Sequence, residues 1–319
     1  KVRVLGGSLQ ESLLFYDDRY RLVKTISENH LSGMDSTEIE YFSSVSQLEK
    51  KVTRYHDGLA TKTIKDEYTY DHLDRVETVK TTIDSDISTV TNTYNDLGEL
   101  ISKNLSGAQT VDYSYNIRGW LERINNGAGL SGNDRFGLDL RYTNAPTAQY
   151  NGNIGQMRWK RDNVNEQGFT YSYDLANRLT DANYFIVGTT GLGFYDVDGI
   201  SYDKNGNITG LTRKMNNTEV DILDYDYTTG NQLSSVKDDG TSDLFEESAS
   251  SGHNENEYIY DANGNMIRDL NKDIININYN YLNLPERVEF GSGDYVEYTY
   301  DAVGTKLKKV TLTGSNLET

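Results

Sequence analysis

A tyrosine followed by aspartate or asparagine recurs along the whole chain, and this repeat limits the possible folds more than any other feature. The tyrosines are 19 to 35 residues apart, about 26 on average. Such a spacing is typical of solenoids and other repeat arrays. Arrays of this kind form a surface or a wall more often than a catalytic pocket. The twelve candidate repeat starts are Tyr16, Tyr41, Tyr70, Tyr94, Tyr115, Tyr150, Tyr173, Tyr202, Tyr227, Tyr260, Tyr281 and Tyr300.

Each copy of the repeat carries the chemistry of a tight turn. Asp or Asn follows the tyrosine in nine of the twelve copies, and a short Asx side chain accepts the backbone N–H two residues on. Four residues after the tyrosine, eight copies hold a residue that tolerates positive φ, as a type I turn closed by a glycine bulge requires. Each copy is therefore predicted to form a β-hairpin. The eight residues are Asp74, Gly98, Gly119, Asn177, Gly206, Asn231, Gly264 and Gly304.

One copy departs from this pattern. Pro285 stands four residues after Tyr281, and its fixed negative φ excludes a left-handed turn. That hairpin is expected to close differently. The predicted structural repeat is defined by the clearer copies: Tyr70, Asp71, Tyr115, Gly119, Tyr173, Asp174, Tyr202, Asp203, Gly206, Tyr260, Asp261, Gly264, Tyr300, Asp301 and Gly304.

Many of the strands end in a Tyr-x-Tyr pair, such as Tyr68/Tyr70 and Tyr258/Tyr260. Side chains two residues apart on a strand share a face, so stacked hairpins would form tyrosine ladders, the core layer of the sheet. The alternative is a ligand-stacking role such as sugar binding, for which Trp120 and Trp159 would be further platforms.

Composition supports an all-β fold. The chain has only two prolines, so sheet ladders run with little interruption, and no segment combines helical periodicity with caps. We expect residues 1–319 to form a single domain of about twelve hairpins, a spiralling antiparallel β-hairpin solenoid. Two stretches interrupt the rhythm and are predicted as loops, 125–149 and the acidic stretch 238–257.

Charge and cysteine content exclude several functions. The net charge of −18 argues against nucleic acid, whose affinity depends on cationic contacts, and against an anionic membrane surface. Cysteine is absent, which removes disulfides and thiol chemistry. No apolar run reaches the length of a membrane helix, and no signal peptide is visible. Because the first residue is Lys1, we expect a piece of a longer or processed polypeptide.

No motif assembles a catalytic, cofactor or metal site. Gly127–Gly132 matches G-x-G-x-x-G in letters only, without the strand and helix that a dinucleotide site needs. Asp203 and Asp261 begin D-x-N-x-N runs, but the position of the final calcium-binding acid holds Lys214 or Lys272. The chain lacks G-x-S-x-G and is predicted not to be an enzyme. Four histidines, none in a metal-binding spacing, complete the survey: His30, His56, His72 and His253.

The Tyr-Asp-x-x-Gly-Asn/Arg-Leu/Ile unit, repeated from Tyr16 to Leu307, resembles the YD-repeat (RHS-repeat) proteins. Copies such as Tyr260–Ile267 and Tyr300–Leu307 match this pattern at several positions. The copies Tyr113–Leu121 and Tyr281–Pro285 resemble the Bacteroidota branch. The resemblance implies a β-hairpin spiral that closes into a cocoon, often around a polymorphic C-terminal toxin. The family's Asp-Pro cleavage motif is missing, because Ala145 and Leu284 precede the two prolines. A partial cocoon is therefore expected.

The resemblance also implies a function. We expect a non-enzymatic shell or scaffold segment of a larger secreted or cell-surface polymorphic-toxin-like protein. Its partners would be the rest of its own polypeptide, secretion machinery or an encapsulated C-terminal domain. One alternative is a cell-surface adhesion or carbohydrate-binding module. A further alternative is a cargo or partner of a type 9 secretion system, as implied by the resemblance to the Bacteroidota branch.

Overall fold

The structure is a computed structural model. It describes residues 2–3, 9–28, 33–41, 47–55, 62–126, 129–130, 132–162, 164–189, 194–228, 230–241, 256–314 and 316–318. These residues form 27 β-strands and a single short 3-10 turn, Leu270–Lys272. All strand pairs within the sheets are antiparallel. The predicted all-β class is confirmed.

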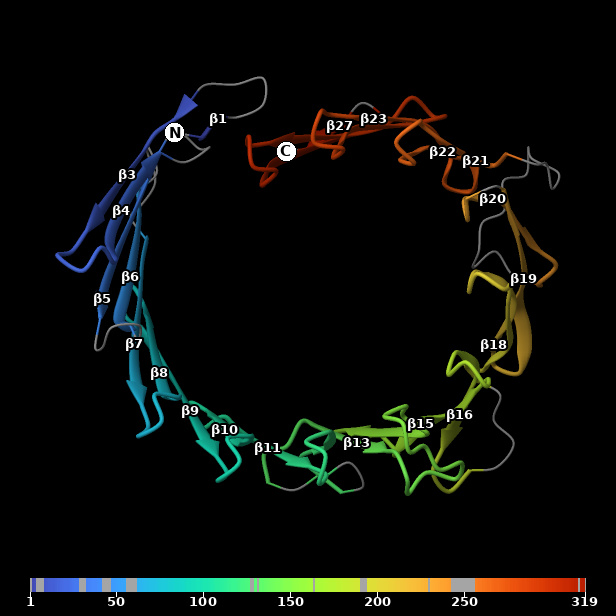
Figure 1. Cartoon of the computed structure of the whole chain (residues 1–319), viewed down its shortest axis with the longest axis horizontal. Helices are drawn as coiled ribbons and strands as arrows, with labels where there is room; N and C mark the ends of the chain where they lie inside the picture. Colours follow the sequence, from blue (N-terminus) through green and yellow to red (C-terminus); the bar gives the residue numbers. More distant parts are fainter. Residues whose placement is uncertain are drawn as a thin grey trace. The chain divides into compact units, whose positions relative to one another are not determined.

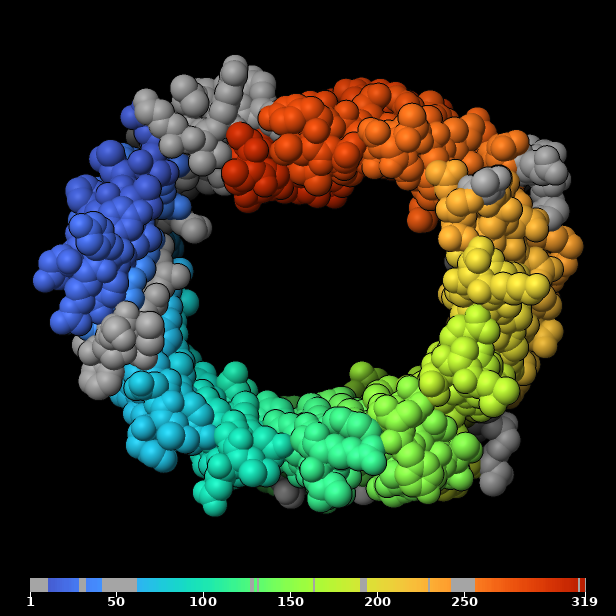
Figure 2. All heavy atoms as spheres, in the orientation of Figure 1, coloured from blue at the N-terminus to red at the C-terminus, as the bar shows by residue number. Residues whose placement is uncertain are grey.

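The chain divides into two compact units, which are described separately. The first contains the described residues of 1–125, 130–135 and 300–307, and the second those of 126–129, 136–299 and 308–319. The prediction of a single domain over residues 1–319 stays a prediction. In the space-filling view, the colours of residues 62–126 change gradually from one strand to the next, so neighbouring atoms there come from neighbouring stretches of sequence (Figure 2).

The first unit is a run of hairpins. From β3 to β12 each strand pairs with the next along the chain (Figure 1). A short pair, β1–β2, precedes them. The strands are β1 (Val2–Arg3), β2 (Leu9–Gln10), β3 (Ser12–Tyr16), β4 (Leu22–Glu28), β5 (Met34–Tyr41), β6 (Gln47–Tyr55), β7 (Lys62–Tyr70), β8 (Val76–Ile83), β9 (Asp86–Tyr94), β10 (Leu100–Leu105), β11 (Gln109–Tyr115) and β12 (Leu121–Ile124).

The strands from β13 onward, which belong to the second unit except for residues 300–307, repeat this plan. Each strand from β13 to β20 pairs with the next, as does each strand from β21 to β25, and β26 pairs with β27. The strands are β13 (Phe136–Arg141), β14 (Gln156–Arg161), β15 (Gln167–Tyr173), β16 (Leu179–Ile186), β17 (Val197–Tyr202), β18 (Ile208–Met215), β19 (Thr218–Tyr227), β20 (Leu233–Asp238), β21 (Tyr258–Tyr260), β22 (Met266–Asp269), β23 (Ile274–Tyr279), β24 (Pro285–Phe290), β25 (Tyr295–Tyr300), β26 (Lys306–Thr313) and β27 (Asn316–Glu318).

The described residues bury little apolar surface. Most strand side chains are half-buried on both faces, and only nine hydrophobic residues among those described are buried. One small cluster, Leu223, Val236 and Tyr258, packs against five partly buried neighbours in the second unit. Contacts between adjacent hairpins must therefore contribute much of the stability, as in other repeat proteins.

Two predictions about the chain's organisation need correction. The stretch 125–149, predicted as one loop, contains β13, whose residues alternate Phe136, Leu138 and Leu140 on one face. Glycine- and asparagine-rich sequence around it obscured this short period-2 pattern. Tyr150, taken as a repeat start, follows no strand and is 69% exposed between β13 and β14.

The hairpin at Pro285 was predicted to need an unusual turn, and this prediction is also wrong. Its turn begins at Tyr279, the last residue of β23, so the residue four positions on is Asn283, with φ 55°. Tyr281 lies in the turn itself, and Pro285 is the first residue of β24, a position that tolerates proline. The assignment of Tyr281 as a repeat start was therefore wrong, and this hairpin uses the same turn as the others.

Most of the predicted acidic loop 238–257 lies outside the described residues, and its two ends belong to ordered structure. Asp238 ends β20. Glu257, directly before β21, is almost fully buried and accepts hydrogen bonds from the Val236 N–H and the Asn271 Nδ2. The loop prediction for the residues between these ends remains a prediction.

Candidate functional site

The most regular arrangement of polar side chains follows the strands that end in tyrosine. We call the tyrosine and the five residues after it a Tyr-Asx turn. In nine such turns the Asx backbone N–H donates to the carbonyl four residues on at 2.8–3.0 Å, and the Asx carbonyl accepts from the third residue on at 2.9–3.3 Å. A register shift at the tyrosine marks the bulge. The Asx residues are Asp17, Asp71, Asn95, Asn116, Asp174, Asp203, Asp261, Asn280 and Asp301.

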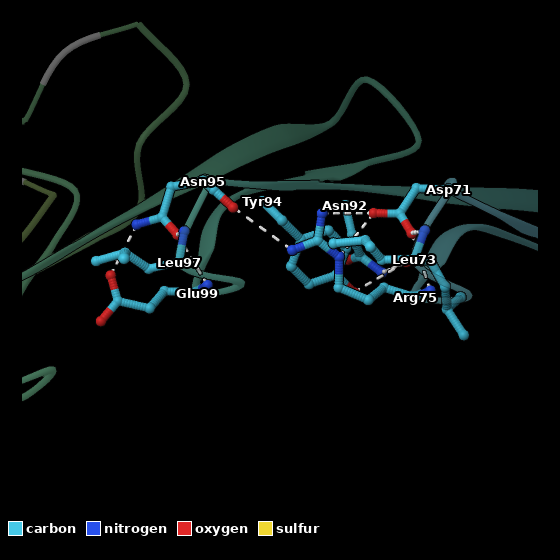
Figure 3. A network of polar contacts seen from close by, with 9 residues as sticks. Asp71, Leu73, Arg75, Asn92, Tyr94, Asn95, Leu97 and Glu99 are labelled. Atoms are coloured by element: carbon cyan, nitrogen blue, oxygen red, sulfur yellow. Dashed lines mark hydrogen bonds and ion pairs between the residues drawn. The ribbon is translucent and has the colours of Figure 1, made fainter.

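The Asx side chain holds each turn closed. Oδ1 of Asp71 accepts the backbone N–H groups of Leu73 at 2.9 Å and Arg75 at 3.0 Å, and Asn95 does the same for Leu97 and Glu99 (Figure 3). Aspartate and asparagine both present this oxygen, which explains why either residue follows the tyrosine.

In three of the turns, which we call arginine turns, an arginine four residues after the aspartate joins one hairpin to the next. The Nε of Arg75 donates to Asp71 Oδ2 at 2.7 Å. Its guanidinium lies 4.5 Å over the ring of Tyr94 in the following hairpin, and Nη1 donates to the Asn95 carbonyl at 3.4 Å (Figure 3). A planar guanidinium makes both contacts at once. The other arginine turns are Asp17/Arg21 and Asp174/Arg178.

In two other turns, which we call asparagine turns, an amide replaces the guanidinium. Asn207 Nδ2 donates to Asp203 Oδ2 at 2.8 Å and to the Oδ1 of Asn231, in the next turn, at 2.9 Å. Asn265 connects Asp261 and Asn283 in the same way. The link between neighbouring turns is then a neutral amide ladder.

The tyrosine hydroxyl adds a second link, directed to the preceding hairpin. Tyr94 donates to the Val76 carbonyl at 2.9 Å, and Tyr202 donates to the Leu179 carbonyl at 2.7 Å. The accepting carbonyl belongs to the residue that opens the preceding hairpin's second strand. Four further tyrosines donate in this way, namely Tyr41, Tyr115, Tyr227 and Tyr279. Tyr173 donates to the carbonyl of Ile154, just before β14.

The turns shift the pKa of their aspartates downwards. Desolvation opposes ionisation of Asp71, but hydrogen bonds from Arg75 and Leu73 outweigh it and lower the pKa of Asp71 to about 2. In Asp203 the amide hydrogen bond from Asn207 is the largest cause of the lowered pKa. Burial raises the pKa of the turn tyrosines Tyr115, Tyr173 and Tyr227. Every one of these shifts favours the form that makes the turn's hydrogen bonds.

The predicted repeat residues occupy equivalent places in these turns. The eight residues predicted to tolerate positive φ all adopt it, with values from 58° at Asp74 to 93° at Gly206. Tyr70, Tyr115, Tyr173, Tyr202 and Tyr260 are half-buried at strand ends. The sequence analysis missed the arginine contacts and the tyrosine hydroxyl contacts. The arginine contacts could have been predicted from the Arg or Asn that stands five residues after several of the tyrosines.

The motifs weighed for other chemistry lie in structural roles or outside the described residues. Asp203 and Asp261 use their carboxylate oxygens inside their own turns. His72 is exposed in a turn. Trp159 is half-buried and its ring stacks on Phe169 at 5.7 Å. Residues that fall wholly or partly outside the described chain are His30, His56, His253 and the Gly127–Gly132 segment.

Two searches cover the described residues only. Among them, no group of three or more His, Cys, Asp or Glu side chains is placed to hold a metal ion. Within the same ranges, no helix has the length and apolarity needed to cross a membrane.

Comparison with known proteins gives a structural likeness only. No model of a protein family and no curated protein matches the sequence. A TcdB2-TccC3-Cdc42 crystal structure is similar with a TM-score of 0.57 and 13% identity over 97% of this chain. Two further structures are too distant in shape to carry an argument. The TcdB2-TccC3 structure has a TM-score of 0.42 and 12% identity, over 96% of this chain and 20% of that one. A porin-like protein from Bacteroides uniformis has a TM-score of 0.25 and 14% identity, over 90% of this chain and 92% of that one.

The chain spans about a fifth (19%) of the length of the TcdB2-TccC3-Cdc42 chain that it matches. At 13% identity the likeness concerns the fold alone. It supports an RHS-like fold, which agrees with the resemblance drawn from the Tyr-Asx repeat.

Proposed function

We propose that this chain is a non-enzymatic segment of the wall of a protein shell, part of a larger polymorphic-toxin-like protein. The observation that carries the proposal is the Tyr-Asx turn network. Its side chains contact and hydrogen-bond adjacent hairpins. Arg75 and Tyr94 do so in one unit, and Arg178 and Tyr202 in the other. Residues committed in this way hold adjacent hairpins together.

The fold likeness gives the proposal a second support. The similar chain is that of the TcdB2-TccC3-Cdc42 crystal structure, and the present chain covers about a fifth (19%) of that chain. We infer that the partners are the rest of the same polypeptide, a secretion machinery or an enclosed C-terminal domain. We also infer that the parent protein is secreted or displayed at the cell surface, with the type 9 secretion route as a candidate.

Limited proteolysis of the natural parent polypeptide, followed by intact mass spectrometry of the fragments, tests the shell. We expect the hairpin region to survive as resistant fragments and to delay cleavage of the sequence enclosed by it. If the sequence outside the hairpin region is cut equally fast whether or not that region is intact, the shell function is wrong. The same spectra give the termini, and a sorting signal there would support the type 9 route.

The adhesion or carbohydrate-binding alternative does not gain from the tryptophans named for it. Trp159 packs against Phe169 and Tyr184, with ring centroids 5.7 Å and 6.4 Å away. Trp120 is half-buried, and Arg118 lies 5.0 Å over its ring. Both rings pack against neighbouring side chains of the chain itself.

A further inference from the structure

A hollow with a volume of about 300 Å³ lies beside the turn that joins β24 to β25 in the second unit, outside the Tyr-Asx turn network. Phe290, Tyr295, Val296 and Leu312 supply apolar side chains to its lining. A volume of about 300 Å³ is at the small end of the pockets that bind organic ligands. The hollow therefore has room for one small ligand with an apolar body.

Two aspartates, Asp273 and Asp294, line the same hollow. Oδ2 of Asp273 accepts the Ser292 N–H at 3.3 Å, and Oδ1 of Asp294 accepts the Gly314 N–H at 2.7 Å. A Cβ placed on Gly291 would lie 2.5 Å from Oδ1 of Asp273, so this carboxylate lies directly against the β24–β25 turn. Hydrogen bonds from the backbone thus hold both carboxylates in place beside the hollow.

Neither carboxylate is neutralised within the described chain. Asp273 and Asp294 form no ion pair with a described residue, and each keeps one oxygen that accepts no hydrogen bond from such a residue. The hollow therefore combines an apolar lining with two carboxylates that lack a cation. The chain's net charge of −18 adds to the attraction for a positively charged ligand.

Two neighbouring cations have other partners. Lys272 Nζ lies 3.5 Å from Oδ2 of Asp269. Arg287, whose guanidinium lies 3.9 Å over one of the lining rings, pairs with Glu289 at 2.9 Å and with Glu297 at 3.2 Å. A cation for the two aspartates would therefore come from a ligand.

We propose that this hollow binds a primary arylalkylamine, with its ring on the apolar lining and its ammonium group on Asp273 and Asp294. An ammonium has three N–H donors for the two carboxylates, and such charge-assisted hydrogen bonds are strong. An aromatic body packs well against the rings of Phe290 and Tyr295. A calcium ion needs more oxygen ligands than two carboxylates give, and the described residues offer no third acidic side chain placed to complete a metal site. The site is independent of the shell function, because no lining residue belongs to a Tyr-Asx turn.

A nuclear magnetic resonance titration of the full chain with phenethylamine tests the site, with phenethyl alcohol as an uncharged probe of the same shape. The amine should bind saturably and shift the amide signals of Ser292, Val296 and Thr313. It should bind about ten-fold more tightly than the alcohol or better. Added salt should weaken the binding of the amine and leave that of the alcohol unchanged.

Asp273→Asn and Asp294→Asn each remove one negative charge but keep an oxygen for the backbone N–H that the side chain accepts. Each should weaken amine binding about ten-fold and leave alcohol binding unchanged. Leu312→Ala should weaken the binding of both probes, because it removes apolar contact. Glu286→Gln is the matched control, since this exposed acid lies in the same hairpin outside the hollow. It should bind the amine like the original chain.

Circular dichroism of each variant separates loss of binding from loss of fold, and the comparison of amine and alcohol on the original chain needs no variant. The proposal is overturned if the two probes bind equally, if neither binds saturably, or if both aspartate variants bind the amine like the original chain. Tighter binding of a blocked tripeptide with a central lysine would assign the site to a peptide side chain and would also overturn it.

Discussion

The arginine turns and the asparagine turns join adjacent hairpins by different chemistry. At Asp174 the guanidinium of Arg178 crosses to the next hairpin, where it lies 4.5 Å over Tyr202 and donates to the Asp203 carbonyl at 3.2 Å. At Asp203 the amide of Asn207 crosses only as far as Asn231, at 2.9 Å. The first link combines charge and stacking, and the second is a neutral hydrogen bond.

Both kinds of turn share the features that the repeat encodes. Each has an aspartate that caps two backbone N–H groups, a residue with positive φ, and a tyrosine at the strand end. The closing of a hairpin and its attachment to the next hairpin therefore depend on different side chains. Closing depends on three positions with little choice of residue, whereas attachment accepts either a cation or an amide.

The largest expected effect tests the shared feature. Gly264 has φ 85°, and an added Cβ there would meet no atom within 4 Å, so a substitution acts through the backbone alone. Gly264→Val should lower the free energy of unfolding by about 1–3 kcal/mol, measured by chemical denaturation. Gly264→Asn should cost much less, since Asn231 and Asn283 hold this position with positive φ. Equal losses for Val and Asn would show that φ does not limit this position.

The tyrosine hydroxyl gives the next effect. Tyr94→Phe and Tyr202→Phe each remove one hydrogen bond to a carbonyl of the preceding hairpin. Each should cost about 1 kcal/mol in the free energy of unfolding. Tyr281→Phe is the matched control, because that tyrosine is 73% exposed. If Tyr281→Phe lowers the free energy of unfolding as much as Tyr94→Phe does, the hydroxyl hydrogen bond is not the cause of the loss.

Acid should act on the aspartates of the turns. The folded pKa of Asp71 is lowered to about 2, below an unfolded value of about 3.9. Its contribution to stability is therefore complete above about pH 4 and is lost as the pH falls through about 2. Asp71→Asn keeps the cap, as Asn95 does, and should flatten the loss of folded signal between pH 4 and 2. Asp96→Asn, an exposed neighbour, should leave that profile unchanged.

The smallest effect should distinguish the two kinds of turn directly. Arg178→Lys removes the planar stacking on Tyr202 and should cost less than about 1 kcal/mol. Added salt should weaken the arginine turn at Asp174 more than the asparagine turn at Asp203, because only the first link carries charge. Hydrogen exchange in the two hairpins with and without salt measures this. An identical salt response in both would contradict the distinction.

The closing of the hairpins was predictable from sequence because it depends on local φ preferences and on side chains two to four residues apart. The same φ preferences indicate that this turn starts at Tyr279 and not at Tyr281, because Asn283 tolerates positive φ and Pro285 does not. Two tyrosines two residues apart made the choice ambiguous. The short strand β13 was missed because glycine and asparagine surround it.

The attachment of hairpins was not predictable in the same way. Arg75 and Tyr94 are far apart in sequence, and their contact depends on the register between hairpins. The proposed shell function came from the resemblance in sequence, and the likeness to the solved structure concerns the fold alone.

The central claim is that each hairpin is held mainly by its immediate neighbours. Hydrogen exchange by mass spectrometry on Gly264→Val tests it most directly, with the original chain as reference. The claim predicts faster exchange in β21–β23 (Tyr258–Tyr279) and the hairpins beside them, while β7–β11 (Lys62–Tyr115) exchange at the original rate. Faster exchange of equal size along both units would contradict it, because the chain would then unfold as one cooperative body.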